Sequence, residues 1–153
     1  MIQRFYIDTS VIGGVFDTEF EEHSIILFEK VKLGQIKVIY SEITEKEISK
    51  AHAEIRDFFD SLPSKSMEFV ELTEEAVQLA DNYIAANVIG KSSREDCLHI
   101  ALATIAKVDI LVSWNFKHIV NIYRIRGYNS VNIRLGYSTL EIRSPKDIVT
   151  NEN

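Results

Sequence analysis

The chain has 153 residues, of which 46% are hydrophobic and 26% are charged. This length fits one domain with a substantial core, and the composition excludes disordered, fibrous and linker-rich chains. The formal net charge of −6 at pH 7 argues against a protein that holds nucleic acid through overall positive charge, but it is compatible with an acidic metal site.

Features along the chain bear on its location and extent. A single cysteine, Cys97, excludes an internal disulfide and fits a reducing cytoplasm. The apolar stretch before Asp8 is too short for a signal peptide, and no run approaches the roughly 18 apolar residues that suggest a membrane span. We therefore expect a cytoplasmic protein with no membrane contact. One domain is expected over residues 1–149, with a frayed C-terminus at 150–153.

The first half of the chain alternates predicted strands and helices. In chain order they are a strand at 5–7, a helix at 22–33, a strand at 37–40 and a helix at 44–59. The strand at 5–7 stops at the polar turn residues 8–10. Thr44, followed three residues later by Glu47, has the form of a capping box, which predicts the start of the second helix.

The second half continues the alternation. In chain order it contains a short strand at 69–72, a helix from 73, a helix at about 92–106, a strand at 110–113, a helix at 116–125, a strand at 140–142 and a short helix from 144. The helix at 92–106 is apolar nearly all round and should be central. Strands separated by helices predict an α/β fold with a mainly parallel sheet that is covered on both faces.

Acidic and polar residues follow several of the strands or begin the next helix. They are Asp8, Glu47 (with Glu42 and Glu45 nearby), Asp96 and Asn115. Ligands of such sheets bind outside the carboxyl ends of the strands, so these side chains are expected to converge. Carboxylates in one place suit Mg²⁺ or Mn²⁺, which can activate water for phosphodiester hydrolysis.

Each acid also has a structural explanation. Asp8 could form a turn or cap a helix, and the capping box accounts for Glu47. Asp96 would meet the positive end of the helix dipole. The combination, rather than any single residue, points to metal chemistry.

Four segments in register resemble the PIN-domain family, which includes the VapC-type ribonuclease toxins. They are IDTSV at 7–11, SEITEKEI at 41–48, DCLHIA at 96–101 and LVSWNF at 111–116. The tail at 127–145 looks like that of a bacterial PIN subgroup described as predicted nucleic-acid-binding.

The resemblance implies a three-layer α/β/α fold and a function. Asp8, Glu47 and Asp96 would bind Mg²⁺ or Mn²⁺, and the protein would be an endoribonuclease acting on RNA. It would be the toxin of a type II toxin–antitoxin pair, bound by a cognate antitoxin, and a homodimer is also expected. Asn115 stands where the family usually has Asp. Its neutral carbonyl oxygen could still orient a metal-bound water, so it is kept among the catalytic candidates.

Several neighbours of the acids are candidates for supporting roles. Thr9, Ser10 and Ser113 could bind a metal-bound water or fix the Asp8 carboxylate, with a plain turn role as the alternative. His99 shares a helical face with Asp96. A supporting role is conceivable for His99, but a core histidine bonded to a backbone group is the favoured interpretation.

Substrate and partner contacts are less specific. Lys91 and Arg94 lie beside Asp96 in the sequence and could meet a substrate phosphate. Trp114 could stack on an RNA base, with core packing as the alternative. Residues 54–59 and the face of Tyr83 and Ile84 are candidate antitoxin or dimer contacts.

Two other functions compete with the ribonuclease. A PIN-fold nucleic-acid-binding or regulatory module with weak or no nuclease activity is favoured by Asn115. A phosphatase with an Asp nucleophile would need a second Asp two residues later. Asp8 is followed by Thr9 and Ser10, so the sequence disfavours the phosphatase.

Overall fold

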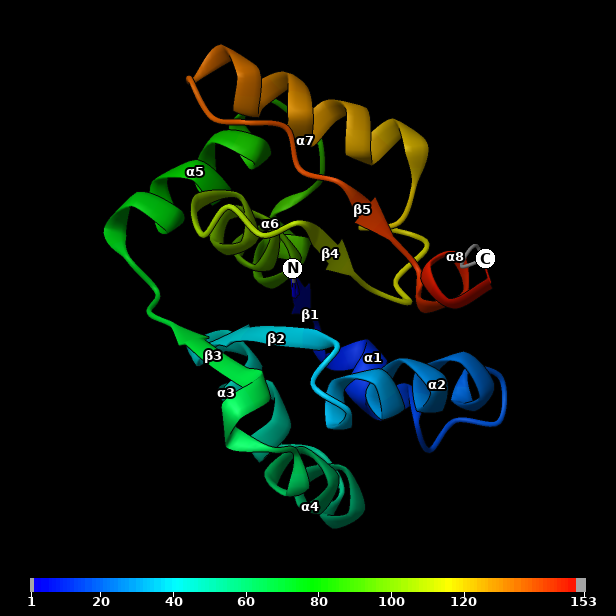
Figure 1. Ribbon diagram of the computed structural model, residues 1–153. Coiled ribbons are helices and arrows are strands. Elements are labelled where there is room, and N and C mark those ends of the chain that lie inside the picture. Colours follow the sequence, from blue (N-terminus) through cyan, green and yellow to red (C-terminus); the bar gives the residue numbers. More distant parts are fainter. Residues whose placement is uncertain (1, 151–153) are drawn as a thin grey trace.

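The computed structural model describes residues 2–150, and its five strands form one parallel sheet in the order β3-β2-β1-β4-β5 (Figure 1). The strands are β1 (Gln3–Ile7), β2 (Ile36–Ser41), β3 (Met67–Val70), β4 (Ile110–Val112) and β5 (Ile142–Arg143). All five coincide with predicted strands to within a few residues. The predicted α/β class with a parallel sheet is confirmed.

Helices connect the strands as right-handed crossovers require. They are α1 (Thr9–Gly14), α2 (Glu21–Lys32), α3 (Glu42–Ser49), α4 (Ala53–Ser61), α5 (Glu74–Ala85), α6 (Arg94–Ile105), α7 (Ile122–Arg134) and α8 (Pro145–Thr150), with short 3-10 turns η1 (Ser64–Ser66) and η2 (Lys91–Ser93). Within residues 2–150, no helix is both long and apolar enough to cross a membrane.

Successive side chains along each strand point to opposite faces of the sheet, so the core has one part on each face. Tyr6 on β1 points to the face covered by α5, α6 and α7, where Leu79, Ile100 and Val131 are buried. Phe5 and Ile7 point to the opposite face, which α1, α2, α4 and α8 cover. Figure 1 shows the two groups of helices on either side of the strands. The expected three layers are therefore present.

The predicted helix at 44–59 is wrong in its start and in its continuity. Ser41 ends β2 with an extended backbone (φ −134°, ψ 179°) and caps α3, with Thr44 as the reciprocal partner in the capping box. The helical chain then stops at Ser49 and restarts at Ala53. Arg56 donates a hydrogen bond to the Ala51 carbonyl (2.6 Å), which stabilises this break. Glu47 lies beyond the first turn, so capping does not explain it.

The predicted helix at 116–125 is also wrong, because α7 begins at Ile122. The Asn121 side chain caps it by accepting from the N–H groups of Tyr123 and Arg124. Helix α1 was not predicted, because it is only six residues long and ends in two glycines. Thr150, expected to fray, belongs to α8, whereas residues 151–153 lie outside the described residues.

Candidate functional site

The candidate site lies at the carboxyl ends of β1 and β4. The chain leaves these neighbouring strands toward opposite faces of the sheet, which creates the crevice where open α/β sheets bind ligands. Asp8 directly follows β1, and Ser113 directly follows β4. Parallel pairing of Ile7 with Val112 brings these two strand ends together.

Two serines hold the buried carboxylate of Asp8. Ser10 Oγ donates to Oδ1 and Ser113 Oγ donates to Oδ2, each at 2.6 Å. Ser10 Oγ also accepts from the backbone N–H of Trp114 (2.9 Å). Burial raises the pKa of Asp8, against the opposing effects of His99 and the two serines. Although Asp8 occupies the N-cap position of α1, its side chain makes no cap hydrogen bond, so the capping alternative does not account for it.

Glu47, on α3, is held by Thr9 and His99. Thr9 Oγ1 donates to Glu47 Oε1 (2.8 Å), and His99 Nε2 lies 2.6 Å from the same oxygen. Thr9 therefore fixes Glu47 rather than Asp8. The expectation that His99 bonds to a backbone group is wrong, because its other nitrogen, Nδ1, contacts the hydroxyl of Tyr6 (2.7 Å).

Glu47 and His99 shift each other's pKa toward the charged form. Burial raises the pKa of Glu47, but the hydrogen bond and charge of His99, with the hydrogen bond of Thr9, lower it below its usual range. Burial alone would lower the pKa of His99, but Tyr6, Glu47 and Asp8 raise it to about 10. Glu47 and His99 thus favour each other's charged form, as expected for an ion pair between a half-buried glutamate and a buried histidine.

Asp96 lies in the first turn of α6, half-buried, with its Oδ2 3.2 Å from His118 Nδ1. Burial raises its pKa, against the hydrogen bond and charge of His118. The charge of Glu47 raises the pKa of both Asp8 and Asp96. The three acids are thus close enough to interact electrostatically.

The Asn115 side chain bonds to the backbone of the turn that follows it. Its Oδ1 accepts from the backbone N–H groups of Lys117 (3.2 Å) and His118 (2.9 Å), which makes it a turn-forming residue. This turn carries His118 to Asp96 and Ser93. Asn115 thus acts on the site through His118 rather than through its own carbonyl oxygen.

The donor chemistry of the site fits a hard divalent cation, because carboxylate oxygens are the ligands that Mg²⁺ and Mn²⁺ prefer. The present arrangement is not a preformed cage. Across residues 2–150, no three His, Cys, Asp or Glu side chains are gathered so that they could hold an ion. An ion shared by Asp8, Glu47 and Asp96 would therefore require some of these side chains to turn from their present hydrogen bonds.

The residues predicted to contact substrate differ in their exposure to solvent. Lys91 is exposed on η2, and Arg94 is exposed at the start of α6, where it pairs with Asp81 (3.2 Å). Trp114 is only 7% exposed, and its indole N–H donates to the buried Ser24. Its ring stacks on Phe20 with centroids 4.4 Å apart. The packing alternative therefore describes Trp114, and the base-stacking expectation is corrected.

One predicted partner surface is also corrected. Tyr83 is fully buried and cannot form a surface contact. Its hydroxyl donates to Asn132 inside the core.

The sequence analysis missed four residues at the site. Tyr6 and Ser41 stand on strands, and their types are ordinary for buried strand positions. Glu95 was passed over beside Asp96, and His118 lies 22 residues from Asp96 in the sequence. The available signal was spacing, because Tyr6 lies only two residues before Asp8 in the sequence.

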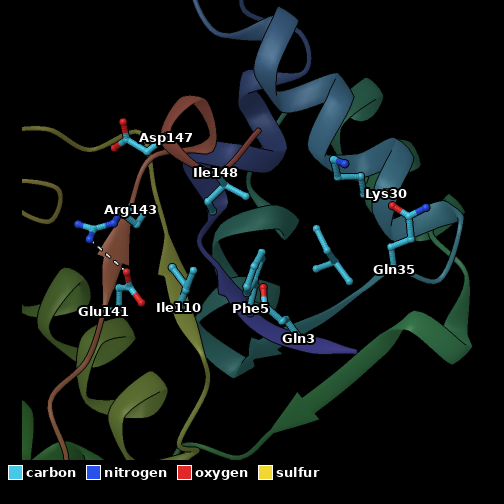
Figure 2. Close-up of a pocket in the computed structure, with 10 residues that line it drawn as sticks. Gln3, Phe5, Lys30, Gln35, Ile110, Glu141, Arg143, Asp147 and Ile148 are labelled. Atoms are coloured by element: carbon cyan, nitrogen blue, oxygen red, sulfur yellow. Dashed lines mark ion pairs between the residues drawn. The ribbon is translucent and has the colours of Figure 1, made fainter. Parts of the chain in front are cut away.

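A separate pocket of about 330 Å³ lies at the opposite edge of the sheet (Figure 2). Gln3, Ile36 and Ile110, which begin β1, β2 and β4, line it. Glu141 and Arg143 form an ion pair on its wall (3.1 Å). None of Asp8, Glu47 and Asp96 lines this pocket, so the candidate site is elsewhere.

The chain thus has a five-stranded parallel sheet with acidic side chains near its carboxyl edge. No family model matches the sequence, and no curated protein matches it. Solved structures do match the fold. A chain of VapBC2 from Rickettsia felis, bound to a DNA fragment from its promoter, has 13% identity and a TM-score of 0.58 over 92% of this chain and 98% of that one.

Two further structures give the same result. A chain of FitAcB from Neisseria gonorrhoeae is 10% identical, with a TM-score of 0.58 over 92% of this chain and 97% of that one. A chain of DNA-bound VapBC from Salmonella typhimurium is 13% identical, with a TM-score of 0.58 over 95% and 99%. At these identities the likeness concerns the fold, and it agrees with the PIN-like fold expected from the sequence.

Proposed function

We propose that this protein is a metal-dependent endoribonuclease and the toxin of a toxin–antitoxin pair. The proposal is supported by three acids near the carboxyl edge of a parallel sheet, where Thr9, next to Asp8, bonds to Glu47 and the charge of Glu47 acts on both Asp8 and Asp96. The likeness to chains of VapBC and FitAB complexes supports a cognate antitoxin as partner. A homodimer and a cytoplasmic location are part of the same proposal.

The three carboxylates would hold Mg²⁺ or Mn²⁺. The ion, when bound, supplies a water nucleophile of lowered pKa and stabilises the charge that develops on the phosphate. Ser10 and Ser113 orient Asp8 and favour its ionised form, because each donates to one of its oxygens. Lys91, on the exposed turn before α6, is suited to meet an RNA phosphate.

The test is cleavage of mixed RNAs by the full chain with Mn²⁺ or Mg²⁺ and with EDTA. Asp8→Asn and Asp96→Asn should each abolish metal-dependent cleavage. Asp60→Asn, an exposed acid on α4, serves as the control and should cleave like the parent. Cleavage that survives in Asp8→Asn, or in EDTA, would refute the proposal.

A second candidate is a PIN-fold nucleic-acid-binding module without nuclease activity. It is favoured by Asn115, whose carbonyl oxygen is committed to two backbone N–H groups and so adds no fourth acid to the site. RNA binding by the parent without cleavage in either metal would select this candidate.

A further inference from the structure

A chain of buried hydrogen bonds lies behind Glu47. Ser41 Oγ is 2.7 Å from the Tyr6 hydroxyl, which is 2.7 Å from His99 Nδ1, and His99 Nε2 is 2.6 Å from Glu47 Oε1. The four residues come from β2, β1, α6 and α3. Ser41 and Tyr6 have no exposed surface and His99 is 2% exposed, so only Glu47 reaches solvent.

This arrangement restricts His99 to one orientation. The Tyr6 hydroxyl binds one ring nitrogen, and the Tyr6 ring contacts the imidazole edge-on at 5.5 Å. Ser41 in turn holds the hydroxyl and caps α3, the helix that carries Glu47. Hydrophobic packing alone does not require polar side chains at these positions. Burying a polar atom costs free energy unless the atom is hydrogen-bonded.

We propose that His99, held by Tyr6 and Ser41, is a positioning residue that fixes Glu47 for the ion. Thr9 and His99 both bind Oε1, which leaves Oε2 as the oxygen for the cation. The inference rests on the proposed metal site and deepens it. Partners of metal ligands act in this way, and their loss weakens metal affinity by about 10-fold to 100-fold.

Tyr6→Phe tests this role with the smallest change, because it keeps the ring in the core and removes only the hydroxyl. The matched control is Tyr83→Phe. Tyr83 is equally buried, and its hydroxyl also makes a buried hydrogen bond, to Asn132. Both variants lose a buried hydroxyl, but only Tyr6→Phe releases His99.

Mn²⁺ affinity of the full chain is measured by isothermal titration calorimetry, with thermal unfolding in EDTA as the check on folding. We expect Kd to rise by about 10-fold in Tyr6→Phe and to stay at the parent value in Tyr83→Phe. His99→Leu should weaken binding further, and His99→Gln, which can still donate to Glu47, should recover part of it. Parent-like affinity in both Tyr6→Phe and His99→Leu would overturn the inference.

A measurement in the absence of metal distinguishes a failure of the proposed function from a failure of the positioning role. It also tests the positioning role if the Tyr6→Phe variant does not fold. In EDTA, the His99 Nε2 proton of the parent should be visible by ¹⁵N NMR and protected from exchange, and Glu47→Ala should remove this protection. A parent that binds no Mn²⁺ refutes the proposed function, even if this proton is protected. An unprotected proton in the parent overturns the positioning contact itself.

Discussion

Gly14→Ala is predicted to destabilise the protein through a collision between two buried side chains and the new methyl group. A Cβ at Gly14 would lie 2.6 Å from Ser24 Oγ and 2.8 Å from Trp114 Nε1. Neither neighbour is free to move away, because Ser24 is fully buried and Trp114 is stacked on Phe20. The same two atoms also hydrogen-bond to each other at 2.8 Å.

The size of the effect follows from three contributions. Forcing an extra carbon into a packed site costs about 1–3 kcal/mol. Loss of the Ser24–Trp114 hydrogen bond costs about 1 kcal/mol, while replacing a helical glycine by alanine returns about 0.5–1 kcal/mol. We therefore expect the free energy of unfolding to fall by about 1–3 kcal/mol.

The adjacent residue supplies the control. A Cβ at Gly13 would meet only Ile55 Cδ1, at an ordinary 3.8 Å, so Gly13→Ala should stabilise by up to about 1 kcal/mol. Urea unfolding followed by circular dichroism and by the fluorescence of the single tryptophan measures both variants. If Gly14→Ala proves as stable as Gly13→Ala, the packing argument fails.

Three more outcomes are expected in urea or thermal unfolding. Ser113→Ala should lose about 1.5–3 kcal/mol at neutral pH, because it removes a donor to the ionised Asp8. That hydrogen bond lowers the pKa of Asp8, so the loss should shrink as acid protonates the carboxylate; a loss independent of pH would contradict this. Asn115→Ala should cost about 1 kcal/mol while Asn115→Asp keeps the acceptor and the stability, and equal melting of the two would argue against the turn. Gly127→Ala should lower the free energy of unfolding by about 1–3 kcal/mol, because the new Cβ would lie 2.6 Å from Val88 Cγ1. A parent-like melting temperature would show that the Val88 side chain moves away without cost.

The strands could be predicted because their signal is local. Short runs of β-branched, aromatic and other apolar residues mark the strands predicted at 5–7, 37–40 and 110–113, and parallel pairing follows from the intervening helices. The same logic places Asp8 at the carboxyl edge. The fold class and the location of the first acid therefore needed no knowledge of side-chain contacts.

Capping and contacts across elements could not be predicted in the same way. Whether Ser41 or Thr44 caps α3 depends on where β2 ends, which is a property of the sheet. His118 reaches Asp96 only because the Asn115 turn replaces the expected helix. In both cases a local pattern had two structural solutions, and the tertiary structure selected between them.

The site is also divided by the sheet that supports it. Tyr6, Ser41, His99 and Glu47 form one hydrogen-bonded set, whose Tyr6 ring belongs to the core under α5 and α6. Asp8, Ser10, Ser113 and Trp114 form another, whose Trp114 ring belongs to the core under α1 and α2. The two sets share no member. In the ligand-free protein, changes in one set should therefore couple to changes in the other only through the charges of Asp8, Glu47 and His99. A cation that binds Asp8 and Glu47 together would add to this coupling, so an increase in energetic coupling on addition of metal would report its binding.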